Sequence, residues 1–134
     1  MKKVGILIGS ISDEEVIMAA KPYFEHFGIK WELYVLSAHR NPEEVSEFSK
    51  NARKNGFGCL IGGAGMAAHL AGAIKAHSSL PVIGIPMPGG VSGGMDALLS
   101  TVQMPKGVPV ATVAVGKAGA INAAILCAEM FSLT

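Results

Sequence analysis

Two stretches of this 134-residue chain place polar side chains in an order that suits small-molecule chemistry, and the first is Ser37-Ala38-His39-Arg40. A histidine ordinarily titrates at about pH 6.5, so it can donate and accept protons near neutrality. A guanidinium binds phosphate through two parallel hydrogen bonds. The pattern therefore predicts proton transfer by His39 beside an anion held by Arg40, although a surface arginine next to a structural loop histidine also fits.

The second stretch, Gly9-Ser10-Ile11-Ser12-Asp13, brings two hydroxyls and a carboxylate together directly after a glycine. This composition suits a phosphate or a hydroxyl-bearing ligand. It is not a P-loop, because the GxxxxGK[ST] pattern is absent. A purely structural interpretation stays open, since Ser12 and Glu15 have the spacing of a helix capping box.

A glycine-rich stretch, Gly62 to His69, follows a strand-like run and leads into a helical pattern. Gly63, Gly65 and Ala68 match the GxGxxG/A spacing of dinucleotide sites, but the acidic residue expected about 20 positions later is missing, which argues against nicotinamide binding. The glycines instead predict a backbone that a ligand approaches closely, with amide groups available to a carboxylate or CO2. His69 is a second candidate proton carrier, or a helix-start histidine bonded to backbone.

Other patterns narrow the chemistry further. The segment 86–95 is rich in Gly and Pro and has the composition of a lid or an intersubunit segment. No His, Cys and carboxylate spacing predicts a metal site, and no GxSxG elbow predicts a hydrolase. Cys59 and Cys127 lie in apolar runs without a CxxC pair, so we expect reduced core thiols.

Strand-like and helical patterns alternate along the chain, and the loops described above connect the end of a strand to the start of a helix. The strand-like runs are nearly continuous apolar segments: VGILIG, WELYVL, CLIGG, VIGIP and VPVATVAV. Strands of this kind are buried on both faces, which is typical of a parallel sheet covered by helices. We therefore predict one α/β domain over residues 1–134, with a three-layer, doubly wound, five-stranded parallel sheet of flavodoxin-like type.

The helical patterns have recognisable ends. The first begins at the Ser12 capping box, contains Pro22 as a kink and stops at Gly28. The second has Asn41 as its cap and Pro42 at its first position. We expect further helices at about 67–77, 95–101 and 118–131. Ligands bind beyond the carboxyl ends of parallel strands, so the loops described above belong to one edge of the sheet.

The amino-acid composition limits which classes of partner the protein can have. Half of the residues are hydrophobic, 16% are charged and the net charge is +1. No basic patch predicts nucleic acid as a partner, and no apolar run is long enough to span a membrane. Between Glu47 and Asp96 there is no acidic residue, so an anionic ligand meets little repulsion there. So few charges on the surface of a small protein predict a homo-oligomer. The lack of a membrane-length apolar run and the unpaired cysteines predict a soluble, cytoplasmic protein.

Five segments together resemble one family, the class I phosphoribosylaminoimidazole carboxylase catalytic subunit, whose members are N5-carboxyaminoimidazole ribonucleotide mutases of purine biosynthesis. The segments are GSISD at 9–13, SAHRNP at 37–42, GAGMAAHLAG at 63–72, PVIGIP at 81–86 and LLSTVQMPKGVPVATVAVGKAGA at 98–120. Departures from the family pattern are Met66, Ala71, Gly89 and Gly90.

The resemblance implies that a carboxylate moves from the exocyclic nitrogen of a ribonucleotide to ring carbon C4, with no cofactor or metal and with CO2 held in the pocket. It implies a homo-octamer, and it implies His39 as the catalytic histidine. From the position of His69 in the glycine-rich loop we also predict that His69 is catalytic. The substrate-binding residues that the resemblance implies are Ser10, Asp13, Ser37 and Arg40. From the loops around them we predict further substrate-binding residues: Ser12, Ala38, Ala64, Gly65, Met66, His69 and Leu70.

Three alternatives stay open on the sequence alone. One is the class II enzyme, which adds CO2 directly to the aminoimidazole ribonucleotide. Another is a non-catalytic nucleotide- or flavin-binding module, which has no use for His39. The third is a related carboxylating enzyme that acts on another heteroaromatic substrate.

Overall fold

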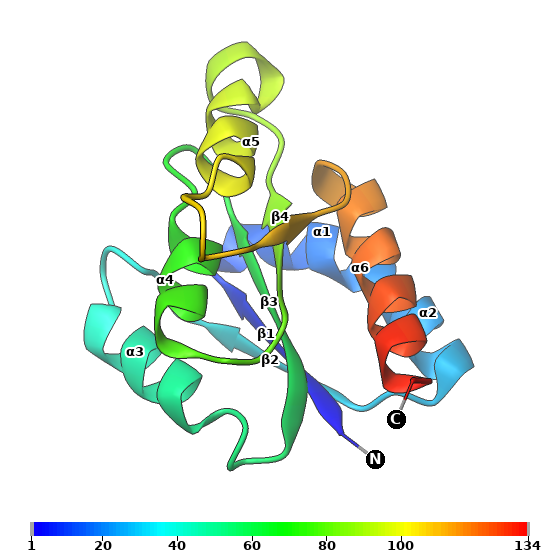
Figure 1. Ribbon diagram of the computed structural model, residues 1–134. Helices are drawn as coiled ribbons and strands as arrows, with labels where there is room; N and C mark the ends of the chain where they lie inside the picture. Colours follow the sequence, from blue (N-terminus) through cyan, green and yellow to red (C-terminus); the bar gives the residue numbers. More distant parts are fainter. Residues whose placement is uncertain (1, 134) are drawn as a thin grey trace.

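The chain folds around a five-stranded parallel sheet with the strand order β2-β1-β3-β4-β5 (Figure 1). The computed structural model describes residues 2–133. The strands are β1 (Lys3–Ile8), β2 (Trp31–Val35), β3 (Phe57–Ala64), β4 (Val82–Pro86) and β5 (Ala111–Thr112). This is the doubly wound, flavodoxin-like α/β arrangement that the sequence predicts.

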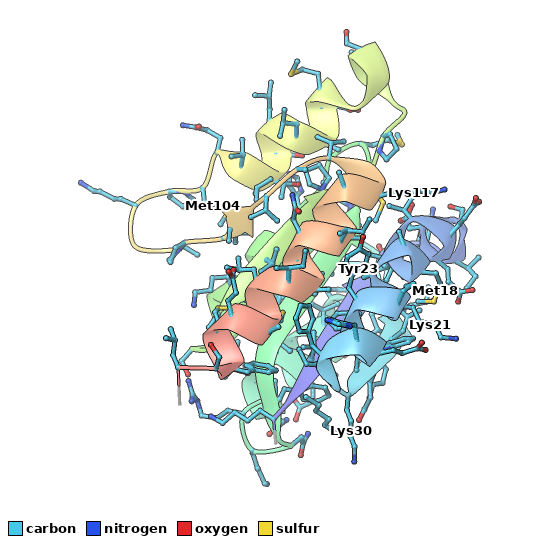
Figure 2. All side chains as sticks on the ribbon, turned by 90° about the vertical axis from the view of Figure 1, so that its right-hand side faces the viewer. Met18, Lys21, Tyr23, Lys30, Met104 and Lys117 are labelled. Carbon is cyan, nitrogen blue, oxygen red and sulfur yellow. The ribbon has the colours of Figure 1, made fainter. Side chains whose placement is uncertain are left out.

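Helices cover both faces of the sheet (Figure 1). On one face lie α1 (Glu14–Ile17), α2 (Lys21–Phe27) and α6 (Gly116–Phe131), and on the other α3 (Pro42–Asn51), α4 (Leu70–His77) and α5 (Met95–Val102). Three short 3-10 turns complete the described chain: η1 (Ile11–Asp13), η2 (Met18–Ala20) and η3 (Val91–Gly93). Figure 2 shows α6 alongside the segment that carries Met18 and Tyr23.

Successive side chains of each strand point to opposite faces of the sheet, so the core consists of two apolar clusters, one on each face. Ile6, Ile8 and Ile61 face α1, α2 and α6, whereas Leu7 and Leu60 face α3 and α4. All five side chains are at most 1% exposed. This two-sided burial explains why the strand sequences are continuous apolar runs rather than alternating ones.

Three segments differ from the sequence-based prediction. Helix α4 begins at Leu70 and not at about residue 67, because residues 65–69 form neither helix nor strand. The first helix does not begin with a Ser12–Glu15 capping box, because Ser10 caps the preceding turn η1 and its Oγ accepts a hydrogen bond from the Ser12 N–H at 3.3 Å. The helical segment is then interrupted by η2, and Pro22 lies at the start of α2, where its missing N–H costs little.

The last strand is much shorter than the predicted 108–115 run. Only Ala111 and Thr112 pair with β4. This strand lies at the sheet edge, and Pro109 has no N–H to donate to a ladder. By contrast, β4 covers residues 82–86 as predicted, and α5 covers 95–102 against a predicted 95–101.

Glycine in β3 allows α4 to pack directly on the sheet. A Cβ placed on Gly62 would lie 2.9 Å from the Ala71 Cα, a backbone atom that cannot rotate away. A Cβ on Gly72, within α4, would meet only the flexible Met104 side chain, at 3.3 Å. The two glycines are therefore a matched pair for testing this close contact.

We predict that Gly62→Ala lowers the free energy of unfolding by about 1–3 kcal/mol, because the helix must move away from the strand. Gly72→Ala is expected to change it by no more than about 1 kcal/mol, since alanine favours the helix. Urea unfolding followed by circular dichroism measures both values. Equal effects at the two positions would contradict the proposed contact.

Candidate active site

Three loops meet at the carboxyl edge of the sheet, because β1 lies between β2 and β3. Ile8 is level with Val35 on one side and with Gly63 on the other. The pairing continues past the strand ends, since the Leu36 N–H donates to the Ile8 carbonyl at 2.9 Å and the Gly9 N–H donates to the Gly63 carbonyl at 3.1 Å. Segments that are far apart in the sequence are thereby held side by side.

A cavity of about 530 Å³ opens between these loops. Every residue predicted to bind substrate or to be catalytic lines it: Ser10, Ser12, Asp13, Ser37, Ala38, His39, Arg40, Ala64, Gly65, Met66, His69 and Leu70. Gly9 and Ala67, which the prediction did not include, also line it. Both residues lie inside loops that the sequence predicts to form the site, so their position in those loops could have identified them as lining residues. The 86–95 segment does not line the cavity; Met87 is instead bonded through its N–H to the Ala64 carbonyl at 3.0 Å.

The two histidines form a direct hydrogen bond across the cavity. His39 Nε2 lies 3.0 Å from His69 Nδ1, and the rings meet edge to face with centroids 5.1 Å apart. His39 follows β2, and His69 is the residue before α4. In such a bond one ring nitrogen donates and the other accepts, so the tautomers of the two rings are linked. The arrangement suits the transfer of a proton.

The loop that carries His39 is closed by Ser37 and Asn41. Ser37 Oγ accepts hydrogen bonds from the N–H groups of His39 and Arg40, both at 3.2 Å. Asn41 Oδ1 accepts from the Ser37 N–H at 3.1 Å, and the Asn41 N–H donates to the Ser37 carbonyl at 2.8 Å. Asn41 is the N-cap residue of α3 and Pro42 its first residue, as predicted, but the Asn41 side chain makes no capping hydrogen bond and fixes this loop instead.

Charge in the cavity comes from Arg40 and Asp13. Arg40 is exposed, and within residues 2–133 no carboxylate lies at ion-pair distance from its guanidinium. Burial raises the pKa of Asp13 above its usual value, and a hydrogen bond with the Ser10 backbone offsets part of that rise. The site thus offers a cation for an anionic group and a half-buried acceptor for hydroxyls.

Met66 adopts a backbone conformation that side chains disfavour. Its φ is +55°, in the left-handed region, and its side chain is 69% exposed at the mouth of the cavity. A non-glycine residue there costs roughly 1 kcal/mol, and strain of this kind concentrates at functional sites. Among residues 2–133 no cluster of three or more His, Cys, Asp or Glu side chains is placed to hold a metal ion.

Comparison with known proteins points to one family. The family model described as AIR carboxylase matches residues 3–134. The N5-carboxyaminoimidazole ribonucleotide mutase of Bacillus subtilis is 48% identical over 129 residues, covering 96% of this chain and 80% of that protein. The enzyme of the same name from Saccharolobus solfataricus is 48% identical over 133 residues, covering 99% of this chain and 83% of that protein.

Solved structures agree with these relatives. The crystal structure of Treponema denticola PurE superposes with a TM-score of 0.88 at 30% identity, covering 99% of this chain and 82% of that chain. A 3-dehydroquinate dehydratase-like protein from Bifidobacterium longum, at 12% identity and a TM-score of 0.60, shares only the fold.

The Asp13 carboxylate generates a prediction about stability. Since its pKa is higher in the folded than in the unfolded chain, the folded state binds this proton more tightly. The fold therefore loses stability as the pH rises from the unfolded pKa through the folded pKa, and the loss is complete above the folded pKa. Asp13→Asn should therefore raise the melting temperature at about pH 7, and the gain should disappear below about pH 3, where the carboxyl is protonated in both states.

Glu14→Gln is the matched control, because Glu14 is the next residue and is exposed. It should give no gain at neutral pH. Differential scanning calorimetry across this pH range measures all three proteins. A lower melting temperature for Asp13→Asn at neutral pH, or a gain that persists in acid, would contradict the assigned burial cost.

Proposed function

The chain belongs to the AIR carboxylase family, and on that premise we propose that it is an N5-carboxyaminoimidazole ribonucleotide mutase of purine biosynthesis. The observation that carries this proposal is the hydrogen-bonded pair of His39 and His69 in a cavity that also holds Arg40, Asp13 and two serines. One cavity thus contains both the groups that bind an anionic ribonucleotide and a histidine that can carry a proton.

Three loops divide the contacts with the ribonucleotide. Arg40 and the hydroxyls of Ser10 and Ser12 hold the phosphate, and the Asp13 carboxylate accepts hydrogen bonds from ribose hydroxyls. The hydroxyls of Ser10 and Ser12 lie 2.9 Å apart, which supports a shared anion contact. The backbone of 64–66 faces the imidazole and its carboxylate, where Gly65 allows a close approach.

The reaction exchanges one proton and one carboxylate within the same substrate. The bond between the exocyclic nitrogen and the carbamate carbon breaks, that nitrogen gains a proton, and CO2 is released inside the cavity. The electron-rich C4 then forms a bond to CO2, and the C4 proton leaves to restore aromaticity. The proton that C4 loses balances the proton that nitrogen gains, so the reaction needs no net acid or base.

His39 carries that proton, and His69 holds the His39 ring through the bond at 3.0 Å. With His39 Nε2 occupied by His69, the His39 Nδ1 is left for exchange with the substrate. Holding CO2 next to C4 replaces an encounter in solution by an effectively unimolecular step. The cavity thus supplies position and a proton relay, which is all the balanced reaction requires.

Assembly into a homo-octamer is the second part of the proposal. Met95, Leu99 and Val102 recur at helical spacing on α5 and are 48%, 55% and 45% exposed. In Figure 2 side chains of α5 project from the upper edge of the molecule. A continuous apolar stripe on a chain with only 16% charged residues supports burial against a second copy.

A cytoplasmic location completes the proposal. Cys59 and Cys127 are both buried free thiols, which suits a reducing compartment. Within residues 2–133 no helix is both long enough and apolar enough to cross a bilayer.

His39→Asn tests the proposed activity. Wild type supplied with N5-carboxyaminoimidazole ribonucleotide and no bicarbonate should form the C4-carboxylated product, and His39→Asn should lower kcat by at least about 100-fold. His77→Asn, an exposed histidine at the end of α4, should retain wild-type kcat. Product is followed by ultraviolet absorbance.

The same assay separates the alternatives. Turnover only of aminoimidazole ribonucleotide with added CO2 would indicate a direct carboxylase. Binding without turnover of either substrate would indicate a non-catalytic module. Full activity in His39→Asn would contradict the assigned proton carrier.

The α5 stripe is tested by Leu99→Lys, which places a charge where the stripe is most exposed along the helix. We expect the assembly to dissociate to smaller species at micromolar concentration with the circular dichroism spectrum unchanged. Leu133→Lys, at an 85% exposed leucine outside the stripe, should leave assembly intact. Sedimentation velocity measures the mass, and an unchanged assembly in Leu99→Lys would contradict the proposed interface.

A further inference from the structure

One side chain outside the cavity holds the loop that carries His69. Ser100 lies on α5, and its Oγ accepts a hydrogen bond from the Ala68 N–H at 2.8 Å. The same hydroxyl lies 3.3 Å from the Met66 carbonyl and 2.7 Å from the Asp96 carbonyl. Because a hydroxyl has one proton, the short contact to Asp96 is its donation, and the acceptance from Ala68 is the link between α5 and the loop.

Ala68 depends on this bond. The residue is 3% exposed, so its N–H is poorly placed to bond to water once Ser100 is removed, and buried amides without a partner are rare. The neighbouring His69 N–H bonds only within the loop, to the Ala67 carbonyl at 2.9 Å. Ser100 therefore supplies a bond from outside the loop next to His69.

The loop needs such an anchor because its own conformation is unfavourable. Met66 has a φ of +55°, and residues 65–69 form neither helix nor strand. Strained backbone persists where surrounding contacts determine it. If the loop relaxed, the His69 ring would move relative to His39, to which it is bonded at 3.0 Å.

We propose that Ser100 is a positioning residue for the reaction: through the Ala68 amide it fixes His69 and the adjacent backbone where the substrate carboxylate moves. This inference rests on the proposed mutase function. It also links α5, the helix with the exposed apolar stripe, to the catalytic pair.

Ser49 provides a matched comparison within the same chain. Its hydroxyl makes the same kind of bond to the carbonyl four residues earlier, to Val45 at 2.7 Å, in the middle of α3. Ser49 is 1% exposed and does not line the cavity. Removing its hydroxyl reproduces the loss of an intrahelical bond without touching the His69 loop.

The experiment compares Ser100→Ala, Ser100→Cys and Ser49→Ala in the full chain. We expect Ser100→Ala to lower kcat by roughly 10- to 100-fold, since displacement of a catalytic group by about 1 Å has effects of that size. KM should stay within about threefold, because phosphate and ribose contacts come from other loops. Ser49→Ala should keep wild-type kcat.

Ser100→Cys separates hydrogen bonding from packing. Cysteine nearly preserves the side-chain volume, but sulfur is a weak acceptor, so kcat should fall as in Ser100→Ala. Wild-type kcat in Ser100→Cys together with a loss in Ser100→Ala would show that volume matters, and would overturn the proposal. Equal kcat values for wild type and Ser100→Ala would overturn it as well.

Amide hydrogen exchange gives a readout independent of catalysis. Exchange of the Ala68 amide, followed by NMR, should be at least about tenfold faster in both Ser100 variants and unchanged in Ser49→Ala. Unchanged exchange in the Ser100 variants would overturn the anchor. If wild type itself fails to convert the ribonucleotide, the proposed function fails, whereas the exchange data still decide whether Ser100 holds the loop.

Discussion

The central constraint in this molecule is that β1 is hydrogen-bonded to β2 on one side and to β3 on the other. A chain that returns to opposite sides of its first strand creates a gap between the following connections, and ligands bind at that point in open parallel sheets. The register makes Val35, Ile8 and Gly63 level, so the three loops start at one height. His39 and His69 approach to 3.0 Å as a direct result.

Two residues at this edge, Asp13 and Met66, are held in states that do not favour the folded chain. Burial raises the pKa of Asp13, so its charged form opposes folding. Met66 is held at a positive φ. The two apolar clusters on the faces of the sheet compensate for such costs, and the site is built on a framework whose strands are buried on both sides. The groups that line the cavity are therefore held in place by the fold itself.

Sequence patterns predicted the framework better than the local contacts. Apolar runs record burial, so β4 was predicted at its observed residues and the cavity-lining loops were identified. Hydrogen-bond partners are decided by tertiary structure, which explains the errors. Asn41 is the N-cap residue of α3, but its side chain accepts from the Ser37 N–H instead of capping the helix, and Ser10 rather than Ser12 caps the first turn. Nothing in the sequence indicates that Ser100 reaches Ala68 across 32 positions.

The most direct test of this account is a crystal structure with aminoimidazole ribonucleotide bound. We expect the phosphate to lie against Arg40 and the serine hydroxyls, with ring carbon C4 about 3–3.5 Å from the nearer imidazole nitrogen of His39. A ribonucleotide bound in this cavity with C4 turned away from both histidines, or bound at another surface altogether, would contradict it.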